Sequence, residues 1–166
     1  MAGLTDGNIG KGSDAMNPNI LIRRAESGDL PELVALLRQL FTIEADFCFR
    51  EDLQRRGLEM LFARAEAVCL AAESAGKVIG MATAQILIST AAGGKKALVE
   101  DVVVTAEFRG RGVGRLLLEG IERWAVSQEV LRLDLAADQN NDPALGFYHR
   151  LGWKRTDLIG FQKKLG

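Results

Sequence analysis

The sequence has little of what several classes of protein require. It contains two cysteines, Cys48 and Cys69, without a Cys-x-x-Cys spacing, and a single histidine, His149. A disulfide framework and a metal site built on histidine and cysteine are both disfavoured, so we expect a reduced, intracellular protein without a metal. No apolar run reaches the length of a membrane span, and the N-terminus lacks a hydrophobic signal core. We therefore expect a cytoplasmic protein with no membrane partner.

An excess of charge of one sign is also missing. The 21 Lys and Arg residues are balanced by 22 Asp and Glu, which gives no long-range attraction to nucleic acid, and we expect no such partner. At 166 residues the chain fits one globular domain. Residues 1–18 are rich in Gly, Ser, Asn and Asp and lack hydrophobic periodicity, so we expect a disordered leader or a cloning remnant, with Met16 a candidate native start. Residues 19–166 would then form the single domain.

The most informative stretch is residues 98–118, Leu-Val-Glu-Asp-Val-Val-Val-Thr-Ala-Glu-Phe-Arg-Gly-Arg-Gly-Val-Gly-Arg-Leu-Leu-Leu. Its first part, Leu98–Val104, predicts a buried strand, and the apolar spacing that begins at Val113 predicts a helix over 112–128. Glycines and arginines lie between them. Because the first N–H groups of a helix have no partner within the helix, this loop predicts an anion-binding site.

Two common anion-binding loops do not fit. A dinucleotide-binding fingerprint would need a third glycine where Arg115 stands, and no Gly-Lys-Ser/Thr closes a Walker loop. The pattern that does hold is Arg109-x-x-Gly112-x-Gly114 between a strand and a helix. It resembles the pyrophosphate loop of the GNAT superfamily, the acyl-CoA-dependent N-acetyltransferases. The alternative is a glycine-rich connection that only lets the helix pack closely.

A second motif favours the GNAT interpretation. Residues 141–153 read Asn-Asp-Pro-Ala-Leu-Gly-Phe-Tyr-His-Arg-Leu-Gly-Trp, similar to the family's Asn-x-x-Ala-x-x-Phe-Tyr-x-x-x-Gly-Phe/Trp segment. The resemblance extends over residues 20–165. It implies an acetyl-CoA co-substrate whose pantetheine arm fills a gap between two splayed strands. The resemblance assigns the acetyl-CoA contacts to Val102, Val103, Val104, Arg109, Gly110, Arg111, Gly112, Val113, Gly114, Arg115 and Asn141.

Hydrophobic periodicity predicts the remaining elements. We expect strands at 20–25, 68–73, 78–89, 98–104, 130–136, 153–156 and 160–164, and helices at 30–40, 51–65, 112–128 and 143–151. Short turns between successive strands indicate an antiparallel meander, and a strand–helix–strand unit indicates a parallel pair. The predicted fold is α/β (α+β), the GNAT fold: a mixed, mostly antiparallel sheet of six to seven strands flanked by about four helices.

The expected chemistry is attack of a neutral amine on a thioester. Removing the proton of an alkylammonium at pH 7 costs about 4 kcal/mol, so a base is useful, and Glu100 and Asp101 are the candidates. Neighbours on one strand face opposite sides, so we expect only one of them to see the site. Leu98-x-Glu100-Asp101 is similar to the Leu-Glu-Asp of polyamine acetyltransferases, where the glutamate acts through water, and this favours Glu100. A structural ion pair of this carboxylate is the alternative.

Tyr148 is the expected general acid for the departing thiolate. A phenol near pKa 10 donates to a thiolate near 8.5 at a cost of about 2 kcal/mol. The alternative is a phenol that packs beside Phe147 and donates to a backbone carbonyl. Helix geometry turns His149 away from this tyrosine, so we expect a surface residue, and we expect Cys48 and Cys69 to be buried, inert thiols.

The acceptor is the least defined part. The aromatic connection 41–49 either packs on the core or forms the wall of an acceptor pocket in which Glu44 or Asp46 attracts a cationic amine. We expect direct transfer of the acetyl group to a primary amine of a small molecule. Acetylation of a protein N-terminus or lysine, and a regulatory CoA-binding module without turnover, stay open. So does a homodimer, since many relatives form one.

Overall fold

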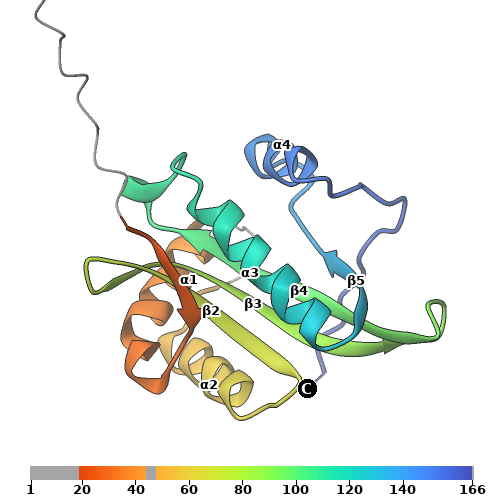
Figure 1. Ribbon diagram of the computed structural model, residues 1–166, viewed down its shortest axis with the longest axis horizontal. Coiled ribbons are helices and arrows are strands. Elements are labelled where there is room, and N and C mark those ends of the chain that lie inside the picture. Colours follow the sequence, from red (N-terminus) through yellow and green to blue (C-terminus); the bar gives the residue numbers. More distant parts are fainter. Residues whose placement is uncertain (1–18, 44–47, 166) are drawn as a thin grey trace, which may run out of the picture.

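The computed structural model describes residues 19–43 and 48–165 (Figure 1). Within them, one five-stranded sheet has the order β1-β2-β3-β4-β5. The strands are β1 (Leu21–Arg24), β2 (Ala67–Ser74), β3 (Lys77–Ser89), β4 (Gly94–Val104) and β5 (Val130–Leu135). The helices are α1 (Leu30–Ile43), α2 (Glu51–Phe62), α3 (Val113–Ser127) and α4 (Asp142–Arg150), with short 3-10 turns η1 (Ser27–Asp29) and η2 (Ala106–Phe108). The expected α+β architecture with four helices is confirmed.

The sheet is mixed, as predicted. Strands β1 to β4 pair antiparallel, and β4 pairs parallel with β5 after the α3 crossover. The first six residues of strand β2, 67–72, are apolar because both faces of the strand are covered. Cys69 and Ala71 pack with α1 and α2, whereas Val68 and Leu70 pack with α3. In Figure 1, α3 crosses the front of the sheet and α4 lies apart, beyond the end of β5.

The prediction of two closing strands at 153–156 and 160–164 is wrong, and the sheet has five strands rather than six or seven. The described part of the chain after α4 is irregular. Its large apolar side chains, Leu158, Ile159, Phe161 and Leu165, are between 75% and 90% exposed. An apolar alternation produces a strand only where a neighbour covers its apolar face, and β5 forms the outer edge of this sheet. The expected leader, 1–18, and the acceptor-pocket candidates Glu44 and Asp46 lie outside the described residues.

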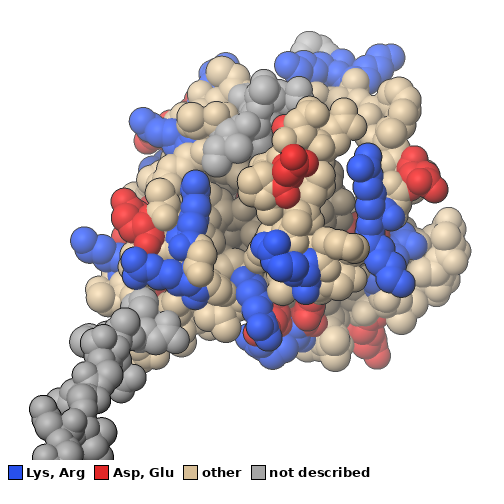
Figure 2. Space-filling model, turned by 90° about the horizontal axis from the view of Figure 1, so that it is seen from above, with Lys and Arg blue, Asp and Glu red and all other residues tan. Residues whose placement is uncertain are grey.

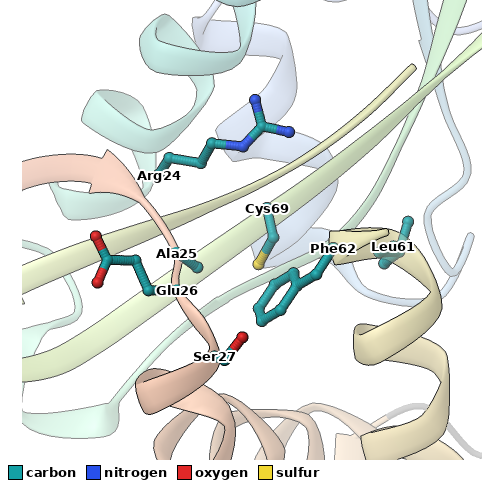
Figure 3. A pocket seen from close by; sticks show the side chains of 7 residues that line it. All are labelled: Arg24, Ala25, Glu26, Ser27, Leu61, Phe62 and Cys69. Atoms are coloured by element: carbon teal, nitrogen blue, oxygen red, sulfur yellow. The ribbon is translucent and has the colours of Figure 1, made fainter. Parts of the chain in front are cut away.

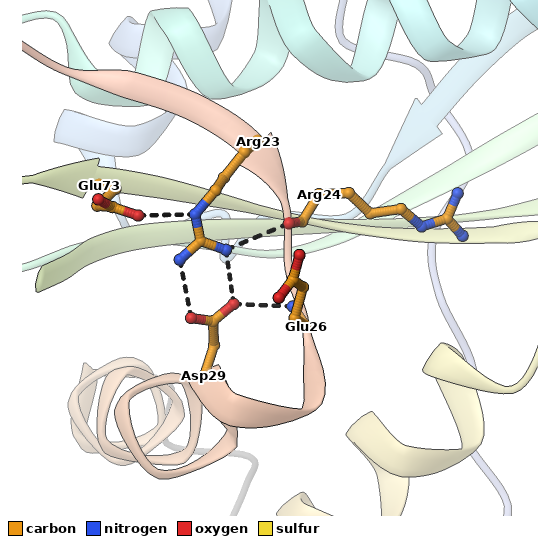
Figure 4. A network of polar contacts seen from close by, with 5 residues as sticks. All are labelled: Arg23, Arg24, Glu26, Asp29 and Glu73. Carbon is orange, nitrogen blue, oxygen red and sulfur yellow. Dashed lines mark hydrogen bonds and ion pairs between the residues drawn. The ribbon is translucent and has the colours of Figure 1, made fainter. Parts of the chain in front are cut away.

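A polar network ties the first strand to the start of α1 (Figure 4). The Arg23 guanidinium donates to both carboxylate oxygens of Asp29, at 2.7 and 2.8 Å, and to Glu73 of β2 at 2.7 Å. The backbone N–H of Glu26 also donates to Asp29, at 2.8 Å. Chiefly through its hydrogen bonds, Arg23 holds the pKa of Asp29 below its usual value of 3.8. This network anchors α1 to the sheet.

Asp29→Asn is expected to lower the free energy of unfolding by about 2 kcal/mol at pH 7, because charge-assisted hydrogen bonds to a partly buried arginine are lost. The pKa of Asp29 is lowered in the folded state, so the stabilisation is complete above about pH 4 and is lost as the pH falls through the folded-state pKa. Urea unfolding from pH 7 to 2.5 should therefore show the difference from wild type shrinking. Asp52→Asn is the control, since its ion pair with Arg50 is exposed, and it should change stability by less than about 0.5 kcal/mol. A pH-independent effect of Asp29→Asn would contradict the expectation.

Candidate functional site

A bulge interrupts β4 where the sequence places its two carboxylates. The register pairs Met81 with Val103 and Thr83 with Glu100, so two residues of β4 stand opposite one residue of β3. Within the bulge Asp101 has φ +52°, a left-handed conformation that an L-residue adopts at a cost of about 1–2 kcal/mol. Bulges and strained non-glycine residues concentrate near functional sites, where they redirect side chains.

Beyond the bulge, β4 separates from β5. Their pairing runs from Lys95 with Val130 to Val99 with Leu135, and it includes no later residue of β4. The N–H of Thr105 donates to Ile79 of β3 at 2.9 Å. Because N–H groups alternate along a strand, those of Val102 and Val104 point to the opposite, open edge. This is the geometry required for a ligand to lie beside β4 like an extra strand.

The open edge continues into the glycine loop at the N-terminus of α3. Gly110 and Gly112 have φ values of +72° and +82°, and Gly112 is the N-cap of α3. A Cβ at either position would meet nothing within 4 Å, so the backbone conformation, rather than crowding, requires glycine there. Gly114 differs, because its Cβ would lie 3.1 Å from the Phe147 ring. Packing against α4 therefore requires glycine at position 114.

Three exposed arginines surround this loop. Arg109 Nε donates to the carbonyl oxygen of Val104 at 2.9 Å, which shows that this carbonyl also points to the open edge. The Arg111 guanidinium lies 5.3 Å from the centre of the Phe108 ring, and Arg115 forms an exposed ion pair with Glu119. Figure 2, viewed from above Figure 1, shows basic side chains around a hollow on this face.

Helix α4 brings the second motif against the first. The side-chain oxygen of Asn141 accepts a hydrogen bond from the N–H of Ala144 at 3.1 Å and caps the helix. The Phe147 ring packs over Gly114 of α3. Tyr148 is half-buried, with its ring centre 5.2 Å from that of Phe147 and 6.1 Å from that of Trp153. Both motifs therefore meet at the N-terminal end of α3.

The expectation that Glu100 and Asp101 face opposite sides is wrong. Thr83 Oγ1 donates to Asp101 Oδ2 at 2.9 Å, and Gln85 Nε2 donates to Glu100 Oε2 at 3.4 Å. Thr83 and Gln85 are two residues apart on β3 and share one face, so the carboxylates that they contact share it too. The extra residue of the bulge causes this, because it reverses the alternation at Asp101.

The two carboxylates differ in environment. Glu100 is exposed, whereas Asp101 is partly buried. The pKa of Asp101 is raised from 3.8 to about 6, chiefly by burial; the hydrogen bond from Thr83 lowers it and the charge of Glu100 adds a smaller rise. A carboxyl group that titrates near neutral pH suits acid–base chemistry.

Comparison with known proteins identifies the family. The profile of the Acetyltransferase (GNAT) family matches residues 31–153, most of the chain. The chain belongs to the GNAT acetyltransferase family. The matched range includes the β4 bulge, the open edge, the glycine loop and α4, so the resemblance expected from the two motifs is confirmed.

Solved structures share the GNAT fold. A transcriptional regulator from Bacillus halodurans C-125 superposes with a TM-score of 0.78 at 21% identity, covering 89% of this chain and 100% of that one. The aminoglycoside N-acetyltransferase AAC(6')-Iy in complex with CoA gives 0.77 at 21% identity, covering 89% and 95%. An aminoglycoside acetyltransferase from an uncultured soil metagenomic sample, in complex with sisomicin, gives 0.73 at 19% identity, covering 89% and 97%. At these identities the likeness establishes the fold.

Sequence reasoning missed two residues of this candidate site, Thr83 and Gln85. The signal that could have indicated them is the alternation Ala-Thr-Ala-Gln within an otherwise apolar strand, which places polar groups at every second position. Their contacts with β4 depend on the register between two strands, which no single segment reveals. The exposed position expected for His149 is confirmed.

The two cysteines differ in burial. Cys69 is buried, as expected, and burial raises the pKa of its thiol to about 12, which leaves it unreactive at neutral pH. Its side chain points into a 280 Å³ pocket together with those of Ser27 and Phe62 (Figure 3). Arg24, Ala25, Glu26 and Leu61 complete the lining, so this pocket includes none of the expected site residues. Cys48 is exposed, so the expectation that it is buried is wrong; the side chain of its neighbour Phe49, rather than the thiol, packs against the core.

Residues 19–43 and 48–165 contain neither a membrane-spanning helix nor a cluster of metal ligands. No helix in this part of the chain is long and apolar enough to cross a membrane. The same residues contain no group of three or more His, Cys, Asp or Glu side chains that could hold a metal ion.

Proposed function

We propose that this GNAT-family protein transfers the acetyl group of acetyl-CoA to a primary amine of a small molecule. The observation that carries the proposal is the backbone of β4. This strand leaves β5 after Val99, and its free edge leads directly into the left-handed glycines at the start of α3. A strand edge without a partner strand suits an amide-containing chain, and a helix N-terminus suits a diphosphate.

Along the chain, the residues proposed to contact the pantetheine arm come first, and those proposed to contact the diphosphate follow. Val102, Val103 and Val104 would lie along the pantetheine arm, with the N–H groups of the first and third available to its amides. Asn141 would contact the arm from the start of α4. The diphosphate would meet the backbone N–H groups of the loop and the arginines around it, namely Arg109, Gly110, Arg111, Gly112, Val113, Gly114 and Arg115.

The contacts that Arg109 and Arg115 make in this structure are compatible with phosphate binding. The ion pair of Arg115 with Glu119 is exposed and therefore worth little, so a phosphate can replace the glutamate. Arg109 uses only Nε on the carbonyl of Val104, so the N–H groups of the two terminal nitrogens of its guanidinium can still donate to a phosphate. An arginine held in this way loses less conformational freedom when it binds a phosphate.

The reaction needs one proton removed and one supplied. An ammonium acceptor loses a proton to the carboxylates of the bulge, with Glu100 acting through water. The neutral amine then forms a C–N bond with the acetyl carbon, the C–S bond breaks, and the departing sulfur takes a proton from Tyr148. The second amine proton leaves to solvent, and Tyr148 regains its proton from solvent. The hydroxyl of Tyr148 is therefore the proposed general acid and Glu100 a proposed base.

A small amine is the favoured acceptor because two of the structural neighbours are aminoglycoside acetyltransferases, one of them in complex with sisomicin. The exposed Glu100 beside Asp101 would attract such a cationic molecule.

The proposal is tested by following thiol release from acetyl-CoA with a panel of amines. The panel contains sisomicin, spermidine, free lysine and a peptide with a free N-terminus. We expect saturable release with at least one small polyamine or aminoglycoside. Release only with the peptide would support a protein acceptor instead. Binding of acetyl-CoA without release on any amine would overturn turnover and favour a regulatory module.

A further inference from the structure

We propose that the acceptor amine also carries a carboxylate, joined to the amine by a short aliphatic chain, and that Lys96 and Arg132 bind this carboxylate. The inference rests on the proposed function and narrows it, because it names one class among the small primary amines. Both cations lie on the same face of the sheet as Glu100, where β4 and β5 are still paired.

The order of side chains along β4 matches the parts of such an acceptor. Alternate residues of a strand share a face, so Glu100, Leu98 and Lys96 point to the same side of the sheet. They present a negative charge, a half-buried apolar surface and a positive charge in that order. At about 3.3 Å per residue, the Cα atoms of Glu100 and Lys96 are about 13 Å apart. An ammonium group, several methylene groups and a carboxylate can lie between these two side chains.

The cationic end of this row already holds a carboxylate of the protein itself. Lys96 is opposite Arg132 of β5 in the register. Lys96 Nζ lies 2.9 Å from Asp134 Oδ2, and the Arg132 guanidinium donates to both oxygens of Asp134, at 2.9 and 3.1 Å. Two cations therefore share one carboxylate, which leaves a net positive charge. Because an ammonium has three N–H donors and a guanidinium five, both side chains keep donors for a second carboxylate.

This end of the face is within reach of a small molecule. Helices α1 and α2 pack against β2 and against Val103, beyond the bulge of β4, while α3 packs against β5 from the opposite face. The side chains of Lys96, Asp134 and Arg132 are 27%, 33% and 49% exposed. They are open enough to be contacted, and their charges are less screened by water than those of fully exposed side chains.

The same charges disfavour an acceptor with an ammonium group at each end. A second ammonium placed near Lys96 and Arg132 would meet a net positive charge, because Asp134 neutralises only one of the two cations. Like charges brought together oppose binding, so a simple diamine would have to leave one end in solvent. Selection for a carboxylate would thus come from repulsion of the competing amine as well as from attraction.

The test compares lysine with cadaverine, which is lysine without its carboxylate. We expect kcat/KM for acetyl transfer, measured by thiol release, to be about tenfold or more higher with lysine, as charge-assisted hydrogen bonds to the carboxylate predict. Arg132→Gln and Lys96→Gln should each lower this ratio by about threefold or more. Because the ratio compares two substrates of one enzyme, a loss of stability in a variant does not move it.

Asp134→Asn should change the ratio in the opposite direction. It leaves both cations without their carboxylate partner, so the preference for lysine should rise by about threefold or more. An ion-pair cluster with a structural role alone would leave the ratio unchanged in all three variants. Lys95→Gln is the matched control, because Lys95 points to the other face of the sheet, where it donates to the carbonyl oxygen of Gln128 at 3.0 Å. This control should keep the wild-type ratio.

A second measurement does not require turnover. In a ¹H–¹⁵N NMR titration with CoA present, lysine should shift the amides of Lys96 and Arg132 saturably, and cadaverine should do so at concentrations about tenfold higher or more. If both amines are acetylated equally well, or if Arg132→Gln leaves the ratio unmoved, the inference is wrong and the proposed function stands. If no amine is acetylated, the proposed function fails, and the titration still decides the inference: selective shifts with lysine support carboxylate binding by these residues, whereas equal or absent shifts overturn it.

Discussion

Tyr148→Phe is expected to lower kcat by about 100-fold or more while the Kd for acetyl-CoA stays within about twofold of the wild-type value. A general acid contributes about 10²–10⁴ to a rate, and phenylalanine removes the donor alone. The aromatic ring would be retained between Phe147 and Trp153, so the packing of α4 against α3 should persist. The variant therefore separates proton donation from ring packing.

The measurements are kcat from thiol release, the Kd from calorimetry and the thermal midpoint. His149→Gln is the control, since His149 is the exposed next residue of the same helix and should leave kcat unchanged. An unchanged kcat for Tyr148→Phe on every acceptor would show that the hydroxyl has a structural role. A lower thermal midpoint with full activity would indicate the same.

Gly112→Ala is expected to weaken acetyl-CoA binding by at least about tenfold, whereas Gly93→Ala should leave binding unchanged. The two glycines have φ values of +82° and +63°, and a Cβ at either would meet nothing within 4 Å. Alanine in a left-handed conformation costs about 1 kcal/mol, so both variants should lose similar stability. Only Gly112 lies at the helix N-terminus proposed for the diphosphate, where a methyl group would displace the anion or shift the amides.

Comparing the two variants cancels the free-energy cost of placing alanine in a left-handed conformation, because both positions have similar φ values. Urea unfolding gives the stability change and calorimetry gives the Kd. Equal affinities for acetyl-CoA in the two variants would mean that the loop at Gly112 does not bind the ligand. A loss of affinity in Gly93→Ala, in the turn between β3 and β4, would point to a general effect on folding.

Local sequence patterns were sufficient to predict much of the fold of this protein. The β-branched run ending at Val104, the glycines that follow it and the helical spacing from Val113 each act within a few residues, so the strand, loop and helix could be predicted. The N-cap of α4 at Asn141 is also a local feature, although the sequence analysis predicted only a ligand contact for this residue. The family resemblance followed from the same two segments.

Features that depend on two distant segments were not predictable. The bulge is a property of the register between β3 and β4, and it places Asp101 and Glu100 on one face where alternation predicted two. The apolar alternation around Phe161 is compatible with a strand, yet β5 has no neighbour on its outer side and the segment stays exposed. In both cases the partner strand, rather than the segment itself, decides the outcome.

The central claim is that acetyl-CoA lies between the open edge of β4 and the N-terminus of α3. The most direct measurement is a ¹H–¹⁵N NMR titration of the wild-type protein with acetyl-CoA. The account predicts saturable shifts at the amides of Val102, Val104 and residues 110–115, with none around the Arg23–Asp29 pair. No saturable shift up to millimolar ligand, or shifts confined to other surfaces, would contradict it.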